Sequence, residues 1–146
     1  MNSKFRSGLI FLPFLALVLM PIQTYASSPT PTPKPDSPTY FRTSALGNLS
    51  DMKKDIGDAQ LALEKGGSWK LLGNAAEIAF NIGQLQALNP PNQYSKTWVK
   101  QVAELDSLSD KFLDSISNGS VSKTRSILSK MIKLIQSMES YAKKVK

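Results

Sequence analysis

The sequence contains neither cysteine nor histidine. Without cysteine, a disulfide framework, a thiolate zinc site, an iron–sulfur cluster and a covalently attached c-type haem are all excluded. Without histidine, the chain lacks the most frequent general base and transition-metal ligand, so Ser-His-Asp and Cys-His nucleophile systems are excluded as well. The remaining residues show no convergent set of nucleophile, base and oxyanion donor. We therefore expect a protein that is not an enzyme.

The first 26 residues follow the order of a secretory signal peptide. Lys4 and Arg6 precede an apolar run at residues 8–20, and Ala26 supplies the small residue at a cleavage point. The apolar run is shorter than the about 20 residues that span a bilayer, although an uncleaved N-terminal anchor is the alternative. We expect export to the periplasm or another compartment outside the cytoplasm. Cleavage would remove two basic residues and lower the net charge from +7 to +5.

Residues 27–40 contain five prolines together with serine and threonine. Proline lacks a backbone donor and biases its predecessor away from helix, so this stretch predicts an extended linker. The predicted organisation is therefore a signal peptide at residues 1–26, a linker at residues 27–40 and one domain at residues 41–146.

The domain divides at three breakers, which are Gly66-Gly67, residues 89–92 and Asn118-Gly119. Between them, apolar residues recur every three or four positions, which is typical of amphipathic helices. The expected seams are Leu49, Met52, Ile56, Ala59 and Leu63; Leu71, Ala75, Ile78, Ile82 and Leu85, flanked by Leu72 and Ala79; Trp98, Val102, Leu105, Leu108 and Phe112; and Leu128, Met131, Ile135, Met138, Ala142 and Val145.

Short connections make consecutive helices antiparallel, so we predict an all-α, up-down-up-down four-helix bundle. A three-helix bundle with residues 41–47 frayed and the first helix docked loosely is the alternative. Expected N-caps are Ser68, Ser95, and Ser120 or Ser122. Trp69 and Trp98 open the second and third helices, where we expect them to cap the core with their indole N–H groups in solvent.

The last helix carries the positive charge of the chain, because residues 119–146 hold seven basic residues and one acidic residue. A solvated outer face is the simpler interpretation. The functional interpretation is a docking face for an acidic protein or an anionic membrane surface. Nucleic acid is not expected, because the helix has one arginine and no interleaved aromatics. The predicted partner-binding residues are Lys123, Arg125, Lys130, Lys133, Lys143 and Lys144.

Two acidic lines run along the first and third expected helices, formed by Asp51, Asp55 and Asp58 and by Asp106, Asp110 and Asp114. Both lie away from the apolar seams and lack the converging loop that a calcium site needs, so we expect solvated carboxylates and no metal site. Methionines on the seams are expected to fill gaps in the core, although thioethers also bind haem or copper.

The order of helices, turns and tryptophans over residues 45–146 resembles the cytochrome c-prime and b-type four-helix-bundle cytochrome superfamily. In c-type members, a Cys-x-x-Cys-His motif near the end of the last helix attaches the haem. The matching positions here are Ser137, Ser140 and Tyr141, with serines in place of the cysteines and tyrosine in place of the axial histidine. Met52 is placed like the methionine ligand of b-type members.

The resemblance implies an exported bundle without covalent haem, whose role is binding or structural. Serine forms no thioether link, and a tyrosine ligand needs a lowered pKa and a nearby cation. We accordingly expect no cofactor. One alternative is an electron-transfer protein that binds haem through Met52 and Tyr141. Another is an extrinsic accessory subunit of a membrane complex, similar to the small four-helix subunit of photosystem II.

Overall fold

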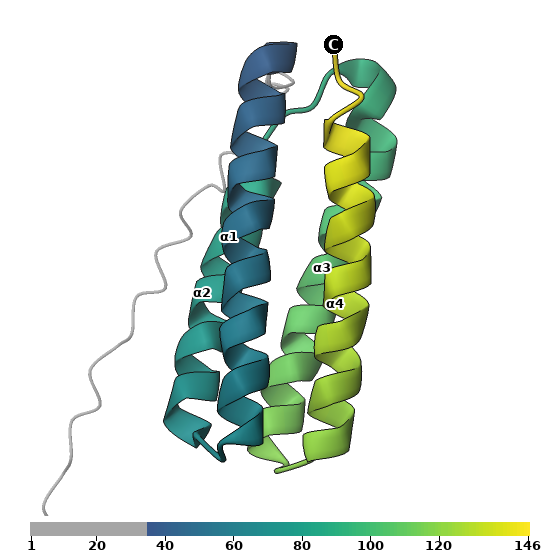
Figure 1. The fold of residues 1–146 in the computed structure, drawn as a ribbon. Helices are drawn as coiled ribbons and strands as arrows, with labels where there is room; N and C mark the ends of the chain where they lie inside the picture. Colours follow the sequence, from purple (N-terminus) through teal and green to yellow (C-terminus); the bar gives the residue numbers. More distant parts are fainter. Residues whose placement is uncertain (1–34) are drawn as a thin grey trace, which may run out of the picture. The chain divides into compact units, whose positions relative to one another are not determined.

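The computed structural model describes residues 35–146, which fold into four α-helices and contain no strand. The helices are α1 (Pro38–Glu64), α2 (Ser68–Gln86), α3 (Asn92–Ser117) and α4 (Val121–Ala142), and they lie side by side (Figure 1). The predicted all-α class and four-helix bundle are confirmed. The expected signal peptide at residues 1–26 and most of the expected linker at residues 27–40 lie outside the described residues.

The four helices contact one another in a ring. α1 packs against α2 and α4, and α3 packs against the same two helices. The pairs α1/α3 and α2/α4 make no such contact within residues 35–146, so α2 and α4 occupy opposite corners of the bundle (Figure 1). The outer faces of α2 and α4 therefore point away from each other and can contact different molecules.

The first helix begins inside the stretch expected as a linker. Ser37 occupies the N-cap position and its Oγ accepts a hydrogen bond from the Tyr40 amide at 3.3 Å, while Pro38 takes a first-turn position that needs no amide hydrogen. The preceding Asp36 exchanges two hydrogen bonds with Asn89, of 2.7 and 2.8 Å. These bonds fix the start of α1 to the connection between α2 and α3.

The remaining helix boundaries lie at the predicted breakers, but two of the expected caps are wrong. Gly66 and Gly119 have φ values of +69° and +63°, a left-handed conformation that favours glycine. Ser68 is the first residue of α2, and α3 already begins at Asn92, which leaves Ser95 within its first turn. Ser120 stands at the N-cap position of α4 without making a side-chain cap bond.

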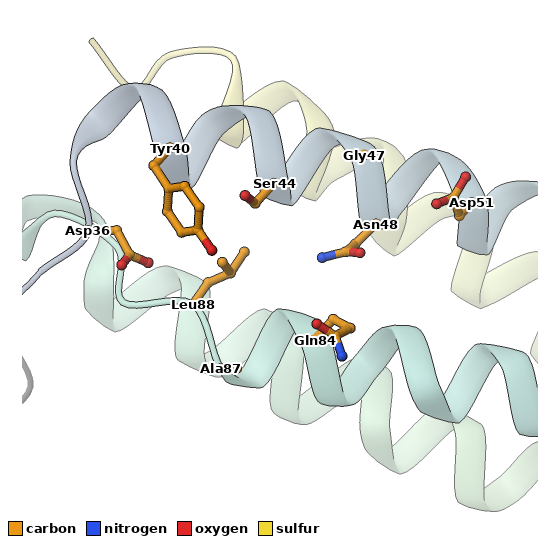
Figure 2. Close-up of a pocket in the computed structure, with 9 residues that line it drawn as sticks. All are labelled: Asp36, Tyr40, Ser44, Gly47, Asn48, Asp51, Gln84, Ala87 and Leu88. Atoms are coloured by element: carbon orange, nitrogen blue, oxygen red, sulfur yellow. The ribbon is translucent and has the colours of Figure 1, made fainter.

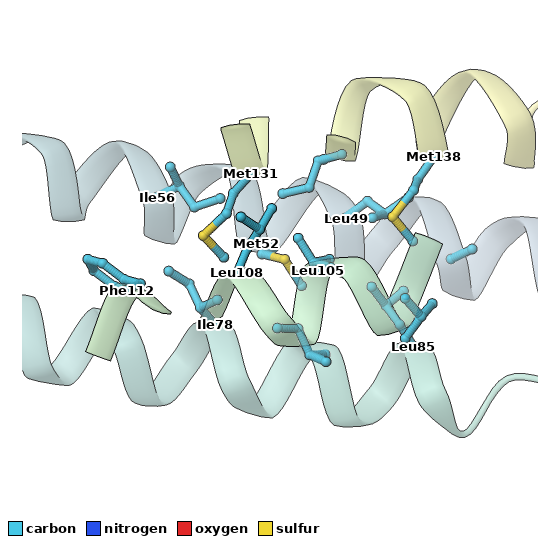
Figure 3. Packing of buried hydrophobic residues seen from close by; sticks show 14 of the residues in the cluster. Leu49, Met52, Ile56, Ile78, Leu85, Leu105, Leu108, Phe112, Met131 and Met138 are labelled. Atoms are coloured by element: carbon cyan, nitrogen blue, oxygen red, sulfur yellow. The ribbon is translucent and has the colours of Figure 1, made fainter. Parts of the chain in front are cut away.

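The core runs along the centre of the ring and contains the predicted seam residues of all four helices except Leu63, which is half-buried (Figure 3). The two residues expected to flank the second seam, Leu72 and Ala79, are both exposed, so that expectation is wrong. Phe41 and Ala45 extend the α1 seam by two turns towards its start, through the stretch that the three-helix alternative treated as frayed. The first helix is thus packed along its whole length, which argues against a loosely docked helix.

The two tryptophans have opposite environments. Trp98 is 1% exposed, and its Nε1 donates a hydrogen bond to the Leu85 carbonyl at 3.3 Å. Its ring lies edge-on to Phe41, with 4.8 Å between the centroids. Trp69 is 87% exposed. The expectation that both rings cap the core with their indole N–H groups in solvent is therefore wrong, because Trp98 is inside the core and Trp69 is outside it.

A small polar cluster is buried where α3 meets α4. The Thr124 hydroxyl lies 2.8 Å from both the Ser115 hydroxyl and the Ser120 carbonyl, and the Ser115 hydroxyl donates to the Phe112 carbonyl at 2.8 Å. Each hydroxyl has a hydrogen-bond partner, so burial does not leave these groups unsatisfied. These hydrogen bonds join α3, the turn and the start of α4, and so stabilise the α3–α4 connection.

Candidate functional site: the outer face of helix α4

All six basic residues predicted to bind a partner are exposed on the outside of the bundle. Apart from Val121, the other exposed residues of α4 are serine and glutamine, so the outer face of α4 combines positive charge with small polar side chains. None of the six forms an ion pair with an acidic residue of the described part of the chain. We call the surface formed by Lys123, Arg125, Lys130 and Lys133 of α4, together with Lys143 and Lys144 directly after its end, the α4 basic face.

The one acidic residue of α4 does not weaken this face. Glu139 is 17% exposed and lies on the flank of the helix that packs towards α1. Its carboxylate forms an ion pair with Lys53 Nζ at 3.1 Å, and the second oxygen lies 3.3 Å from the same nitrogen. The positive potential of the α4 basic face is therefore not screened by a carboxylate on its own surface.

Met52, placed by the resemblance as a haem ligand, lies fully inside the core. It has no exposed surface, and Figure 3 shows its side chain beside Leu105, Leu108 and Met131. A haem bound to the Met52 sulfur would displace these core neighbours. The packing around Met52 fits a gap-filling thioether and does not fit a haem ligand.

The other three positions from the resemblance do not converge on Met52. Tyr141 is half-buried, and its hydroxyl donates to the Tyr94 carbonyl at 3.1 Å, a bond that iron ligation would break. Ser137 and Ser140 are exposed; Ser137 pairs with Gln101 at 3.1 Å, and Ser140 donates to Gln136 at 2.9 Å. The positions of the family's haem-attaching cysteines thus face outward, beside the α4 basic face.

The two acidic lines differ from each other at one residue. Asp106, Asp110 and Asp114 are exposed, as are Asp51 and Asp58, but Asp55 is half-buried and accepts a hydrogen bond from Asn81 at 3.0 Å. Within residues 35–146, no group of three or more acidic residues is placed to hold a metal ion.

Burial raises the pKa of Asp55, and the nearby carboxylate of Glu77 raises it further, while Lys54 acts in the opposite direction. Because the pKa lies above that of an unfolded chain, the charged carboxylate costs stability near neutral pH. That cost vanishes when the pH falls below the ordinary range of aspartate. Asp55 therefore joins α1 to α2 through its hydrogen bond with Asn81, at an electrostatic cost to the charged carboxylate.

A groove of about 380 Å³ lies between the first half of α1 and the end of α2 (Figure 2). Ser44 and the amides of Asn48 and Gln84 line its middle, while Asp36 and Asp51 stand at opposite ends. Asp36 is already engaged with Asn89, and the two carboxylates are too far apart to act as a pair. The groove offers polar contacts but no general acid and base in reach of one another.

The apolar outer face of α2 was not predicted from the sequence. Trp69 and Phe80, which are 87% and 63% exposed, lie on the outer face of α2 with small residues between them. Their spacing of 11 residues, about three helical turns, is the signal that could have revealed a common outward face.

None of the helices in residues 35–146 combines the length and apolar character that crossing a membrane requires. Fold and surface together define the class as an all-α four-helix bundle with a basic outer face. No family model, curated protein or solved structure matches the chain.

Proposed function

We propose that this chain is an exported, non-enzymatic binding module that docks an acidic protein through the α4 basic face. The observation that carries the proposal is the exposure of six basic side chains on one outer face, with the only acidic residue of that helix paired to α1. The closed core supports it, since Met52 is buried among apolar neighbours and Tyr141 is engaged elsewhere.

The proposed topology is an antiparallel up-down-up-down bundle. Residues 65–67, 87–91 and 118–120 connect the helices, and connections this short favour antiparallel neighbours. Two contacts across the ends support this topology. Arg42 Nη1 donates to the Val145 carbonyl at 3.2 Å, so the start of α1 lies beside the segment after α4, and the Tyr94 hydroxyl donates to the Lys144 carbonyl at 3.0 Å.

An acidic protein fits this face better than a membrane does. Helices that bind at a membrane surface insert large apolar side chains beneath their basic residues. On α4, Val121 at the very start is the exposed large apolar residue, and Trp69 and Phe80 lie on α2 at the opposite corner. A membrane that received the lysines of α4 would leave these aromatic side chains pointing away from it.

The sequence-based expectations for the N-terminal region complete the proposal. A signal peptide at residues 1–26 would export the domain, and the proline-rich stretch that follows would hold it at a distance from whatever lies before it. If the acidic partner belongs to a membrane complex, this protein would be an extrinsic subunit of that complex. Haem-linked electron transfer has no supporting observation in the packing of Met52 and Tyr141.

The test measures binding to immobilised poly-L-glutamate by interferometry. The wild-type chain should bind, and binding should weaken with added salt, because the screening length falls from about 10 Å at 0.1 M to about 3 Å at 1 M. The triple variant Lys123→Glu, Lys130→Glu and Lys133→Glu should lose about tenfold or more in affinity, since each exposed charge contact contributes about 0.2–1 kcal/mol and reversal adds repulsion.

The matched control reverses three exposed lysines elsewhere, with Lys65→Glu, Lys100→Glu and Lys111→Glu, and reaches the same net charge. It should retain most of the affinity, and circular dichroism should show that both variants are folded. If both triple variants lost the same affinity, net charge alone would explain the binding, and a specific binding face would be contradicted. Binding to phosphatidylglycerol vesicles but not to poly-L-glutamate would contradict an acidic protein as the partner.

A further inference from the structure

The outer face of α2 is apolar although it points away from the core. Trp69, Leu72 and Phe80 are 87%, 40% and 63% exposed, and Gly73 and Ala76 lie between them on the same side of the helix. Scattered exposed apolar residues are normal, but a continuous apolar helix face marks a contact surface. No other element of the described chain covers it, because α2 contacts α1 and α3 on its two flanks.

The centre of this face allows close approach by another backbone. A methyl group placed on Gly73 would meet no atom within 4 Å, so the surface there is open. Ala76 adds only a methyl group one turn further on. Two large aromatic side chains therefore flank a shallow centre, an arrangement that can seat a second helix.

We propose that this face pairs with the same face of a second copy of the chain, in an antiparallel arrangement about a two-fold axis between Gly73 and Ala76. A two-fold axis at that point brings each residue opposite its counterpart on the other side of the centre. Trp69 then lies against Phe80 of the partner copy, and Gly73 lies against Ala76. Large side chains meet at both ends, and small side chains meet in the middle.

The charges of α2 fit the same axis. Lys70 and Glu77 are the only charged residues of the helix, and seven residues, or about two turns, place them on one flank. In an antiparallel pair related by a two-fold axis, equivalent flanks face each other. Lys70 of one copy therefore lies near Glu77 of its partner, twice in the dimer. A parallel pairing would place the equivalent flanks on opposite sides of the helix pair, so Lys70 and Glu77 would not meet across it.

The exposed area suits a weak dimer that forms at high protein concentration. Aromatic side chains bury about 150–250 Å² each, so Trp69 and Phe80 at their exposures offer on the order of 300 Å² per copy. Leu72 and the half-exposed Leu61 of neighbouring α1 extend the patch towards the roughly 800 Å² per partner of a stable interface. A cavity of about 630 Å³ beside the face gives the partner's side chains further room, and its lining includes Lys65 and Lys70 as well as Leu61 and Gly73.

Such a dimer would present two α4 basic faces on its outer sides, because α4 lies at the corner opposite α2. Dimerisation stands on the α2 face alone and does not depend on what α4 binds.

Sedimentation equilibrium over micromolar to millimolar concentrations tests the dimer. The wild-type chain should dimerise, and Phe80→Lys should weaken the dimer by about thirtyfold or more, because it replaces one of the two aromatic anchors and acts twice in a two-fold dimer. Val99→Lys, which changes a 60% exposed apolar residue on α3, is the control and should leave the dimer intact.

The charge pairs give a sharper test. Lys70→Glu alone and Glu77→Lys alone should each weaken self-association, by about tenfold, whereas a mixture of the two single variants should form a heterodimer of near wild-type strength. A contact within one chain could not be rescued by mixing two chains.

Because the chain has no cysteine, single cysteines report the direction of pairing. Ala76→Cys lies near the proposed axis and should form a disulfide-linked dimer, while Ala87→Cys, at the end of the same face, should not. Cross-linking by both variants would indicate a parallel pair and overturn the proposal. A wild-type chain that stays monomeric, or that leaves solution for neutral lipid vesicles in a Trp69-dependent manner, would overturn it as well.

Discussion

Replacing Trp98 by alanine should lower the free energy of unfolding by about 3–5 kcal/mol, the usual cost of removing a large aromatic side chain from a core. The same replacement at Trp69 should change it by less than about 0.5 kcal/mol, because substitutions on an open surface have little effect on stability. The chain thus offers two tryptophans that differ in their environment and not in their chemistry.

The expected loss at Trp98 has three sources. Its ring is 1% exposed, so alanine leaves a large cavity. Its edge-on contact with Phe41, at 4.8 Å between centroids, disappears. Its indole N–H no longer satisfies the Leu85 carbonyl, to which it donates at 3.3 Å. A loss of this size is a large part of the about 5–15 kcal/mol that stabilises a typical domain.

Urea unfolding followed by circular dichroism measures both variants. The protein concentration should be low enough to keep the chain monomeric, because Trp69 belongs to the proposed dimer face and association would add to stability. Similar losses for Trp69→Ala and Trp98→Ala would contradict the placement of the two side chains.

Met52 gives the second large effect. Met52→Ala should cost about 2–5 kcal/mol, because it opens a cavity at the centre of the core, whereas Met52→Leu should cost less than about 1.5 kcal/mol because it conserves volume. The same urea experiment applies. A leucine variant as unstable as the alanine variant would show that the thioether does more than fill space.

The sequence predicted the interior of the helices well, because burial follows the helical period wherever a seam is continuous. The seams of α3 and α4 are buried as expected, including Val145, which lies beyond the end of its helix. At the end of α1, Ala62 is buried and Leu63 is half-buried, the reverse of the expected order. The buried position can shift by one residue near a helix end, because few neighbouring side chains fix the rotation of the helix there.

The start of α1 was missed because its proline was read as part of a linker. In the sequence Ser37-Pro38, the serine caps the helix and the proline occupies the first turn, so the signal was present. Trp69 was expected to cap the core and Leu72 to flank a seam because both are large and apolar, but both are exposed. The size and polarity of a side chain alone do not show whether it is buried in the fold or exposed on a surface that can bind another molecule.

The candidate site was predictable in part. Clustering of basic residues in the last helix follows from composition, and their exposure follows from their positions opposite the seam. The pairing of Glu139 with Lys53 required the structure, since the two residues come from different helices. The resemblance used helix order and turn spacing, and neither fixes which way Ser137 and Ser140 point around α4.

We propose that this protein acts through its outer surface and not through a group held in its core. The visible absorption spectrum of the chain purified from the cells that make it tests this most directly. We predict no Soret band, because Met52 is enclosed by core side chains and the Tyr141 hydroxyl is bound to the Tyr94 carbonyl. A stoichiometric Soret band that Met52→Leu or Tyr141→Phe abolishes would contradict the account.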